Sequence, residues 1–297
     1  MPKRAKYSIW RTKRAYLYII PSLILFFFFF LYPLIYTLYI SMTNANFFNI
    51  MKEPTFYGLE NYKTLIFEGK FFNPFIKTIL FILTSVPLKV FTGLLLAVLF
   101  SSSYIKARRI LFSLIIIPWS APWFFLVLIW RGMFNQDFGI INQFLRSIGL
   151  MPINWLNDIK NAFISYNIVE VYLAYPFVTS VIFAAIQSIP SDLYESAIVD
   201  GANAWIKFRY ITLPLIKKSI LWATIMTTMA SYLIFGVPFL LNRGGPAREN
   251  EFLLIYGYKE SFDFGYYGYG AAFMVLVFII LTILVIVFLR LTRMLEE

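Results

Sequence analysis

The chain has 297 residues, of which 60% are hydrophobic and only 14% are charged, with 33 Phe and 20 Tyr. A soluble domain carries about 25% charged residues, so this chain lacks the polar surface that water would require. Its formal net charge is +11, and it contains no cysteine and no histidine. Disulfides, thiol catalysis, zinc sites built on Cys or His, and histidine general bases are therefore excluded. We expect no catalytic residue and no metal site.

Six apolar runs are long enough to cross about 30 Å of hydrocarbon, which takes about 20 helical residues. They lie at residues 15–41, 74–101, 110–130, 162–189, 217–241 and 268–290. The first run is too long for the apolar region of a signal peptide, so we expect an uncleaved span. The sequence predicts an all-α, polytopic membrane helix bundle with six transmembrane helices. Residues 1–14 would form a basic N-terminal tail, and residues 15–297 a single transmembrane domain.

The positive charge is concentrated on alternate connecting segments. The two tails, the 102–109 loop and the 190–216 loop with its flank together carry fifteen basic and five acidic residues. The opposite segments, 42–73, 131–161 and 242–267, carry nine of each. By the positive-inside rule, both termini and the 190–216 loop are cytoplasmic. Nucleic acid is not an expected partner, because no basic stripe with interleaved aromatics lies outside the spans; membrane lipid is.

A polar stretch, YESAIVDGANAWIKFRYITLPLI (Tyr194–Ile216), interrupts the apolar sequence on the predicted cytoplasmic side. Ser191 or Asp192 can cap a short helix just before it. An Asp192 cap would place Glu195 in a capping box. We expect this helix to run to about Asp200.

The chain should then turn at Gly201, since glycine adopts a positive φ without steric cost. A second short helix is expected to begin at Asn203 and to end before Pro214, because proline disrupts a helix interior. Trp205 and Phe208 on this helix are too apolar for a linker in water. This pattern favours two short helices that dock on a partner; the alternative is an amphipathic loop on the inner leaflet.

The same stretch resembles the EAA signature of ABC importer permeases, which is roughly E-A-A-x-x-D-G-A, nine further positions and L-P. The matching residues are Glu195, Ala197, Asp200, Gly201, Ala202, Phe208, Ile211, Leu213 and Pro214, whereas Ser196 replaces an alanine. The resemblance implies a coupling element seated in a cleft of a cytoplasmic ATPase subunit. We expect Glu195, Asp200 and Gly201 to shape this element, and Ala202, Trp205 and Phe208 to make the contacts.

Further motifs are similar to those of sugar-type permeases of the maltose and glycerol-phosphate class. They are GLENY (58–62), Pro118-Trp119 with Pro122, NRGGP (242–246) and GYGAA (268–272). The resemblance implies a complex of two permease chains, two ATPases and an extracytoplasmic solute-binding protein in a prokaryotic plasma membrane. Such a complex imports a sugar or oligosaccharide by alternating access. The chain lacks a Walker A pattern, so we expect ATP and Mg on the ATPase subunits and no cofactor here.

Helix-breaking residues suggest where the solute passes. Pro118 and Pro122 should unwind the third span, and such backbone is tolerated only where protein or a watery cavity satisfies it. Tyr175-Pro176-Phe177 should kink the fourth span, and the residues around Pro238 the fifth. For each residue, ordinary helix packing is the alternative. The candidate pathway residues are Lys89, Trp119, Trp123, Glu170, Tyr175, Phe177, Ser231, Tyr232, Phe235 and Gly236.

Two charged residues, Lys89 and Glu170, lie inside predicted spans, where each costs about 2.5–3.5 kcal/mol on insertion scales. One hypothesis is that they pair with each other in a structural role. The other is that Lys89 helps to hold an anionic sugar.

An ion-coupled secondary transporter, with Glu170 as its ion site, is the rival function. It would usually show internal repeats, and we find no convincing repeat. It would also have no use for a coupling loop.

Overall fold

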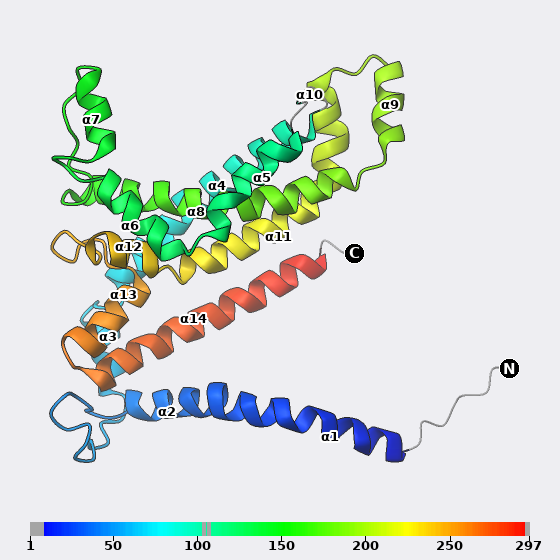
Figure 1. Ribbon diagram of the computed structural model, residues 1–297. Coiled ribbons are helices and arrows are strands. Elements are labelled where there is room, and N and C mark those ends of the chain that lie inside the picture. Colours follow the sequence, from blue (N-terminus) through cyan, green and yellow to red (C-terminus); the bar gives the residue numbers. More distant parts are fainter. Residues whose placement is uncertain (1–8, 103–104, 106–107, 295–297) are drawn as a thin grey trace. The chain divides into compact units, whose positions relative to one another are not determined.

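The computed structural model describes residues 9–102, 105 and 108–294, and these residues are mostly helical (Figure 1). The elements, with η marking π-helical turns, are α1 (Ile9–Phe26), η1 (Phe27–Leu31), α2 (Tyr32–Ser41), α3 (Glu60–Phe67), α4 (Phe72–Ser101), α5 (Arg108–Ser120), α6 (Trp123–Met133), α7 (Ile140–Ser147), α8 (Ile159–Gln187), α9 (Ser191–Val199), α10 (Ala204–Lys207), η2 (Phe208–Thr212), α11 (Leu213–Tyr232), α12 (Gly236–Asn242), α13 (Leu253–Tyr258), η3 (Lys259–Asp263) and α14 (Tyr267–Met294). Within these described ranges, an isolated bridge between Thr43 and Phe56 is the one strand-like pairing. The predicted all-α class is confirmed.

Four uninterrupted helical stretches are long and apolar enough to cross a membrane. They are Tyr18–Ser41, Phe72–Ser101, Ile159–Gln187 and Tyr267–Thr292. Two further pairs of bent helices meet the same requirement together, so the described residues hold four candidate spans, or up to six if each pair is one span. The number six and the side of the termini stay predictions.

The two bent pairs lie close to predicted helix breaks, although Pro118, which is expected from the sequence to unwind the third span, lies inside α5. Ile110–Ser120 and Trp123–Met133 meet at 93°, and Pro122 stands at the start of the second helix. Ala204–Tyr232 and Gly236–Asn242 meet at 43°. The fourth span differs, because α8 continues unbroken through Pro176. A transmembrane helix can tolerate proline when neighbouring groups satisfy the carbonyl that the ring leaves free.

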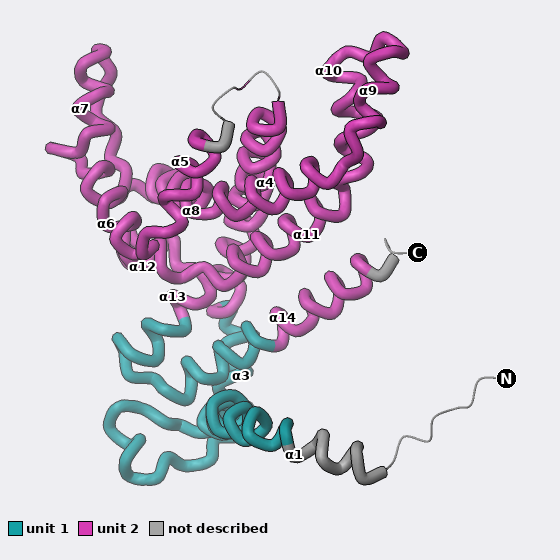
Figure 2. The backbone as a smooth tube through the Cα atoms, turned by 45° about the vertical axis from the view of Figure 1, so that its right-hand side comes forward, with its two compact units in different colours: residues 1–69, 257–278 teal, residues 70–256, 279–297 magenta. Residues whose placement is uncertain are grey.

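The described residues form two compact units, which Figure 2 colours separately. One contains the chain up to Gly69 together with Gly257–Phe278, and the other contains Lys70–Tyr256 together with the chain from Ile279. The expectation of one transmembrane domain over residues 15–297 stays a prediction.

In the larger unit, α4 and α8 pack closely along each other. A Cβ placed on Gly93 of α4 would lie 2.3 Å from Cγ1 of Val178 on α8, so only glycine allows this approach. One apolar cluster, around Phe81, Tyr166 and Phe252, lies at one end of the two helices. A second cluster, of Ala97, Val178, Ile182, Ile186, Ile216 and Ala223, lies toward the other.

In the smaller unit, two of the motifs have a structural role. Asn61 of GLENY is buried and donates its amide to the carbonyls of Ser41 and Thr43, at 3.0 and 2.9 Å. These bonds fix the chain where it leaves α2. Gly268, which opens GYGAA, approaches the same segment, since a Cβ there would lie 2.2 Å from the Thr43 carbonyl oxygen.

Candidate functional site

The first helix of the EAA-like stretch, α9, begins at Ser191, two residues earlier than a capping box with Asp192 and Glu195 requires. Pro190 is its N-cap, with φ −58° and ψ 134°, and no side chain caps the helix. The predicted Ser191 or Asp192 cap and the capping box with Glu195 are therefore wrong. Because proline already fixes the extended entry into the helix, Ser191 and Asp192 lie in its first turn.

The glycine turn is confirmed. Gly201 has φ +79°. The N–H of Gly201 donates to the Ile198 carbonyl at 3.0 Å and the N–H of Ala202 to the Ala197 carbonyl at 2.8 Å, which is a Schellman motif that ends α9. The spacing of Ala197, Asp200, Gly201 and Ala202 in the signature thus corresponds to the positions of this helix end.

The second helix begins as predicted but does not end as predicted. The Asn203 side chain caps α10 by accepting from the Ile206 N–H at 2.9 Å. The chain then continues through η2 into α11, with Pro214 near the start of α11. The π-helical turn η2 lies immediately before the proline, and the helical path continues through it. Pro214 has no backbone N–H to donate, but a residue in the first turn of a helix has no partner for that N–H in any case.

We call α9, the Gly201 turn and α10 the coupling hairpin. In Figure 1 it projects from one end of the larger unit. The Tyr194 and Thr212 hydroxyls, 2.9 Å apart, join α9 to η2. The sequence gives no signal for this contact, because it depends on the register of two helices across the turn.

Large apolar side chains of the hairpin and of η2 are exposed to solvent. Trp205 is 67% exposed and Tyr210 74%, while Val199 is 88% exposed. The rings of Trp205 and Phe208 lie 5.8 Å apart. Such a surface is typical of a docking site for another protein.

The predicted pathway residues Lys89, Glu170 and Ser231 meet inside the larger unit. Lys89 donates to Glu170 at 2.7 Å and to the Ser231 hydroxyl at 2.9 Å. The Lys89 side chain is 1% exposed and that of Glu170 18% exposed. This is the contact that the pairing hypothesis requires, and it joins α4, α8 and α11.

The aromatic pathway residues lie in separate contacts. A Cβ on Gly236 would lie 2.2 Å from the Trp123 ring, which packs on it, and the ring of Trp119 lies 6.1 Å from that of Phe177. The remaining three residues are Tyr175, 5.9 Å from Tyr172, the buried Tyr232, and Phe235, stacked on Phe239 at 4.7 Å. The contacts described here do not by themselves join all ten predicted residues into one site.

Comparison with known proteins places these features in a family. Residues 58–296 match a family described as "Binding-protein-dependent transport system inner membrane component". The chain is 33% identical over 284 residues to the trehalose/maltose transport system permease protein MalF of Thermococcus litoralis, covering 95% of this chain and 94% of that one. It is also 33% identical to the sulfoquinovosyl glycerol transport system permease protein SmoG of Agrobacterium fabrum, covering 94% and 90%.

The fold has solved counterparts. The structure resembles a chain of a bacterial ABC transporter involved in the import of the acidic polysaccharide alginate, with a TM-score of 0.80 and 24% identity, covering 97% of this chain and 98% of that one. These findings favour an ABC importer over the ion-coupled alternative. The chain belongs to the family of inner membrane components of binding-protein-dependent transport systems, the permease subunits of ABC importers.

Proposed function

We propose that this chain is the membrane-spanning subunit of an ATP-driven importer that takes up a sugar or oligosaccharide delivered by a solute-binding protein. The observation that carries the proposal is the coupling hairpin, which presents the exposed Trp205 ring within the stretch that resembles the EAA signature. The saccharides named for the relatives at 33% identity support the substrate class.

As an inner membrane component, the protein is a multi-pass protein of the prokaryotic plasma membrane. The proposed topology has six spans, both termini in the cytoplasm and one permease domain over residues 15–297. The excess of basic residues on the connecting segments of one side supports this orientation. The coupling hairpin is then cytoplasmic.

The proposed complex contains a second, different permease subunit, two cytoplasmic ATPase subunits and the solute-binding protein. One solved relative is described in complex with a "pentasaccharide-bound periplasmic protein", which supports the last partner. In this family the ATPase partners bind nucleotide, so ATP and Mg belong to them and this chain carries no cofactor.

The helical path from Ala204 to Tyr232 suggests how the hairpin drives transport. α10, η2 and α11 form one continuous lever that begins at the hairpin and ends at the 43° bend before Gly236. Closure of the ATPases would pull on Ala202, Trp205 and Phe208 and tilt this lever, so that access to a site within the membrane alternates. Ala197, Asp200 and Gly201 shape the turn at the end of α9, and Pro214 lies near the start of α11.

For the pathway we propose the residues predicted from the sequence, at the bends before Trp123 and Gly236. Trp119, Trp123, Tyr175, Phe177, Tyr232 and Phe235 would offer ring faces to a sugar. Lys89, Glu170 and Ser231 hold the helices beside the pathway. Glu170 balances the charge of Lys89, so the pair as a whole offers no net positive charge to an anionic solute.

Purification of the tagged chain in mild detergent tests the proposal. Two ATPase subunits and a second permease should copurify, and saccharide uptake in proteoliposomes should stop without ATP even when an ion gradient is held. Trp205→Ala should lower ATPase recovery several-fold. Trp222→Ala, at a tryptophan of α11 that is 52% exposed, is the matched control and should not. ATP-independent uptake driven by an ion gradient would support the secondary transporter instead.

A further inference from the structure

A polar pocket of about 500 Å³ lies in the larger unit, away from the coupling hairpin. Three segments line it: the end of α6 with the turn after it, the loop before α8, and the end of α12. On the proposed topology these segments belong to the outer face. The volume falls within the roughly 300–1,000 Å³ of small-molecule sites.

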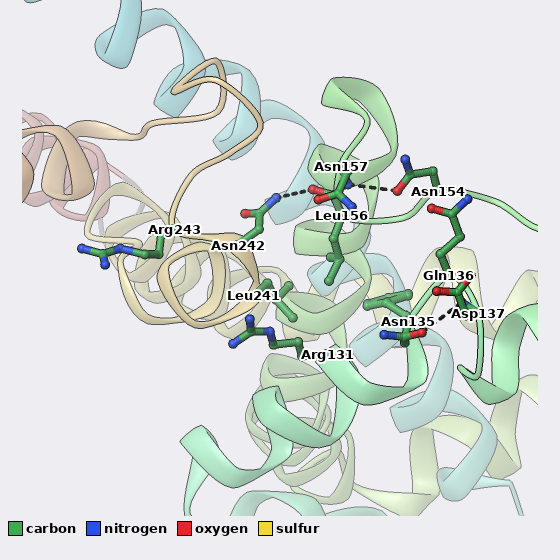
Figure 3. A pocket seen from close by; sticks show the side chains of 11 residues that line it. Arg131, Asn135, Gln136, Asp137, Asn154, Leu156, Asn157, Leu241, Asn242 and Arg243 are labelled. Atoms are coloured by element: carbon green, nitrogen blue, oxygen red, sulfur yellow. Dashed lines mark hydrogen bonds between the residues drawn. The ribbon is translucent and has the colours of Figure 1, made fainter.

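One side of the pocket is cationic, and the other carries amide side chains and one carboxylate, which we call the acidic side. Figure 3 shows Arg131 and Arg243 on one side, and Asn135, Asp137 and Asn154 on the other. Arginine recognises planar anions through paired hydrogen bonds. The side-chain oxygens of Asn135 and Asn154 already accept from backbone N–H groups. Their amide nitrogens can donate to hydroxyl oxygens, and the Asp137 carboxylate can accept from hydroxyl groups.

The backbone on the acidic side is held in place by side chains of α7. Asn142 of α7, which is fully buried, donates to the carbonyls of Gln136 and Ile153 at 3.1 and 2.9 Å. Arg146 donates to the carbonyls of Asp137 and Gln136 at 2.8 and 3.1 Å. Because α7 occupies these backbone carbonyls, it fixes the 135–137 turn from behind.

On the cationic side, the backbone at Asn242 and Arg243 is fixed, and the Arg243 guanidinium lies 5.3 Å from the centre of the Phe239 ring. The Asn242 amide donates to the Leu156 carbonyl at 2.7 Å, and the buried Tyr166 donates to the Asn242 side-chain oxygen. Arg243 follows in the left-handed region, with φ +57°, which is uncommon for a residue other than glycine. Such backbone persists where the surroundings determine it, and it clusters at functional sites.

We propose that this pocket binds an acidic saccharide as it enters the pathway, with the carboxylate or sulfonate at Arg131 and Arg243 and the hydroxyls at Asn135, Asp137 and Asn154. The inference rests on the proposed function and names its substrate class. The volume favours a sugar residue over one acidic side chain of the binding protein, which would leave most of the pocket to water. The lysine inside the spans does not compete, because Glu170 neutralises it.

The test is direct binding to the purified permease–ATPase complex without its binding protein, with trigalacturonate as the acidic probe and maltotriose as the neutral probe. Trigalacturonate should bind the wild type more tightly than maltotriose. Arg131→Gln should weaken trigalacturonate binding about tenfold or more, which corresponds to about 1.4 kcal/mol, and leave maltotriose binding unchanged. Lys160→Gln removes an exposed charge from the same 131–161 segment, outside the pocket, and should change the affinity for neither probe.

Three outcomes would overturn the inference. The first is equal affinity of the wild type for both probes, and the second is an equal loss of affinity for both probes in Arg131→Gln. The third is weaker docking of the sugar-free binding protein on Arg131→Gln, which would make the pocket a contact with that protein. Uptake of any saccharide by the complete system would then keep the proposed function intact. If the complete system takes up no saccharide from a broad panel, the function fails and the inference fails with it.

Discussion

Lys89 is buried so deeply that its charge is stable only when it is paired and hydrogen-bonded. Its side chain is 1% exposed, and its ammonium is hydrogen-bonded to Glu170 and Ser231. The ring of Phe81 lies 5.8 Å from the same nitrogen. Removing one partner of a buried ion pair leaves the other charge uncompensated and costs about 3–5 kcal/mol.

We therefore expect Lys89→Met to lower the thermal unfolding temperature of the detergent-solubilised complex and the yield of assembled complex. Glu170 would be left as an unpaired carboxylate within a span. Lys77→Met makes the same substitution on α4 at a partly exposed lysine and should have little effect.

A double-mutant cycle separates pairing from other roles of Lys89. Lys89→Met with Glu170→Met should be more stable than the sum of the single changes indicates, because the double variant leaves no charge unpaired. Additive losses would contradict the structural pair. A stable, fully assembled Lys89→Met complex that had lost uptake of acidic solutes alone would favour the substrate-ligand hypothesis.

At the scale of elements, the contact between α4 and α8 depends on Gly93. Its Cβ-free face lies against Val178, so Gly93→Ala would force the two helices apart. Overpacking of this kind costs about 1–3 kcal/mol. We expect a lower thermal unfolding temperature for Gly93→Ala, with recovery when Val178→Gly removes the opposing side chain.

Gly132→Ala is the matched control. Gly132 lies in α6 with nothing within 4 Å of an added Cβ. Alanine there should leave stability unchanged or raise it slightly, since glycine is the poorer helix former. Equal destabilisation by both alanines would show that close helix approach is not the cause.

The coupling hairpin depends on a different glycine for a different reason. Gly201 has open space around it, and its φ of +79° alone restricts substitution. A β-branched residue is an outlier at positive φ, whereas asparagine tolerates it. Gly201→Val should reduce ATP-driven uptake several-fold and leave the thermal stability of the spans unchanged, and Gly201→Asn should retain most uptake. Uptake by Gly201→Val at the wild-type rate would mean that the turn geometry is not needed for coupling.

Elements governed by local chemistry could be predicted from the sequence, and those governed by register could not. The apolar runs located the candidate spans, and Pro122 located a break, because these signals lie within one segment. Pro176 gave the same signal in α8 but no break. The Asp192 cap failed because Pro190 had already set the helix entry.

The site shows the same division. The cost of charge in a membrane predicted that Lys89 and Glu170 could meet, but Ser231 as the shared partner depends on the rotation of a third helix. The pocket between Arg131 and Arg243 joins segments more than a hundred residues apart. No local pattern indicated it.

At the scale of the whole molecule, the direction of the bundle across the membrane decides which face the proposed ATPase subunits could reach. The chain contains no cysteine, so one introduced cysteine gives this chain a single labelling site. Val199 of the hairpin and Met151 of the 131–161 segment are both 88% exposed, which matches their accessibility to a reagent. A difference in labelling between cysteines at these two positions should then come only from the side of the membrane on which each lies.

With a membrane-impermeant maleimide, Met151→Cys should label in intact cells, and Val199→Cys should label only in inverted vesicles. The hairpin's segment and the other segments predicted on its side together carry fifteen basic residues, and the positive-inside rule predicts that such segments are cytoplasmic. Labelling of Val199→Cys in intact cells would place the hairpin outside, where no cytoplasmic ATPase could reach it. That result would remove the physical basis of coupling through α10, η2 and α11. Labelling of Val199→Cys in inverted vesicles that is blocked when the ATPases are bound would instead locate the docking surface on the hairpin itself.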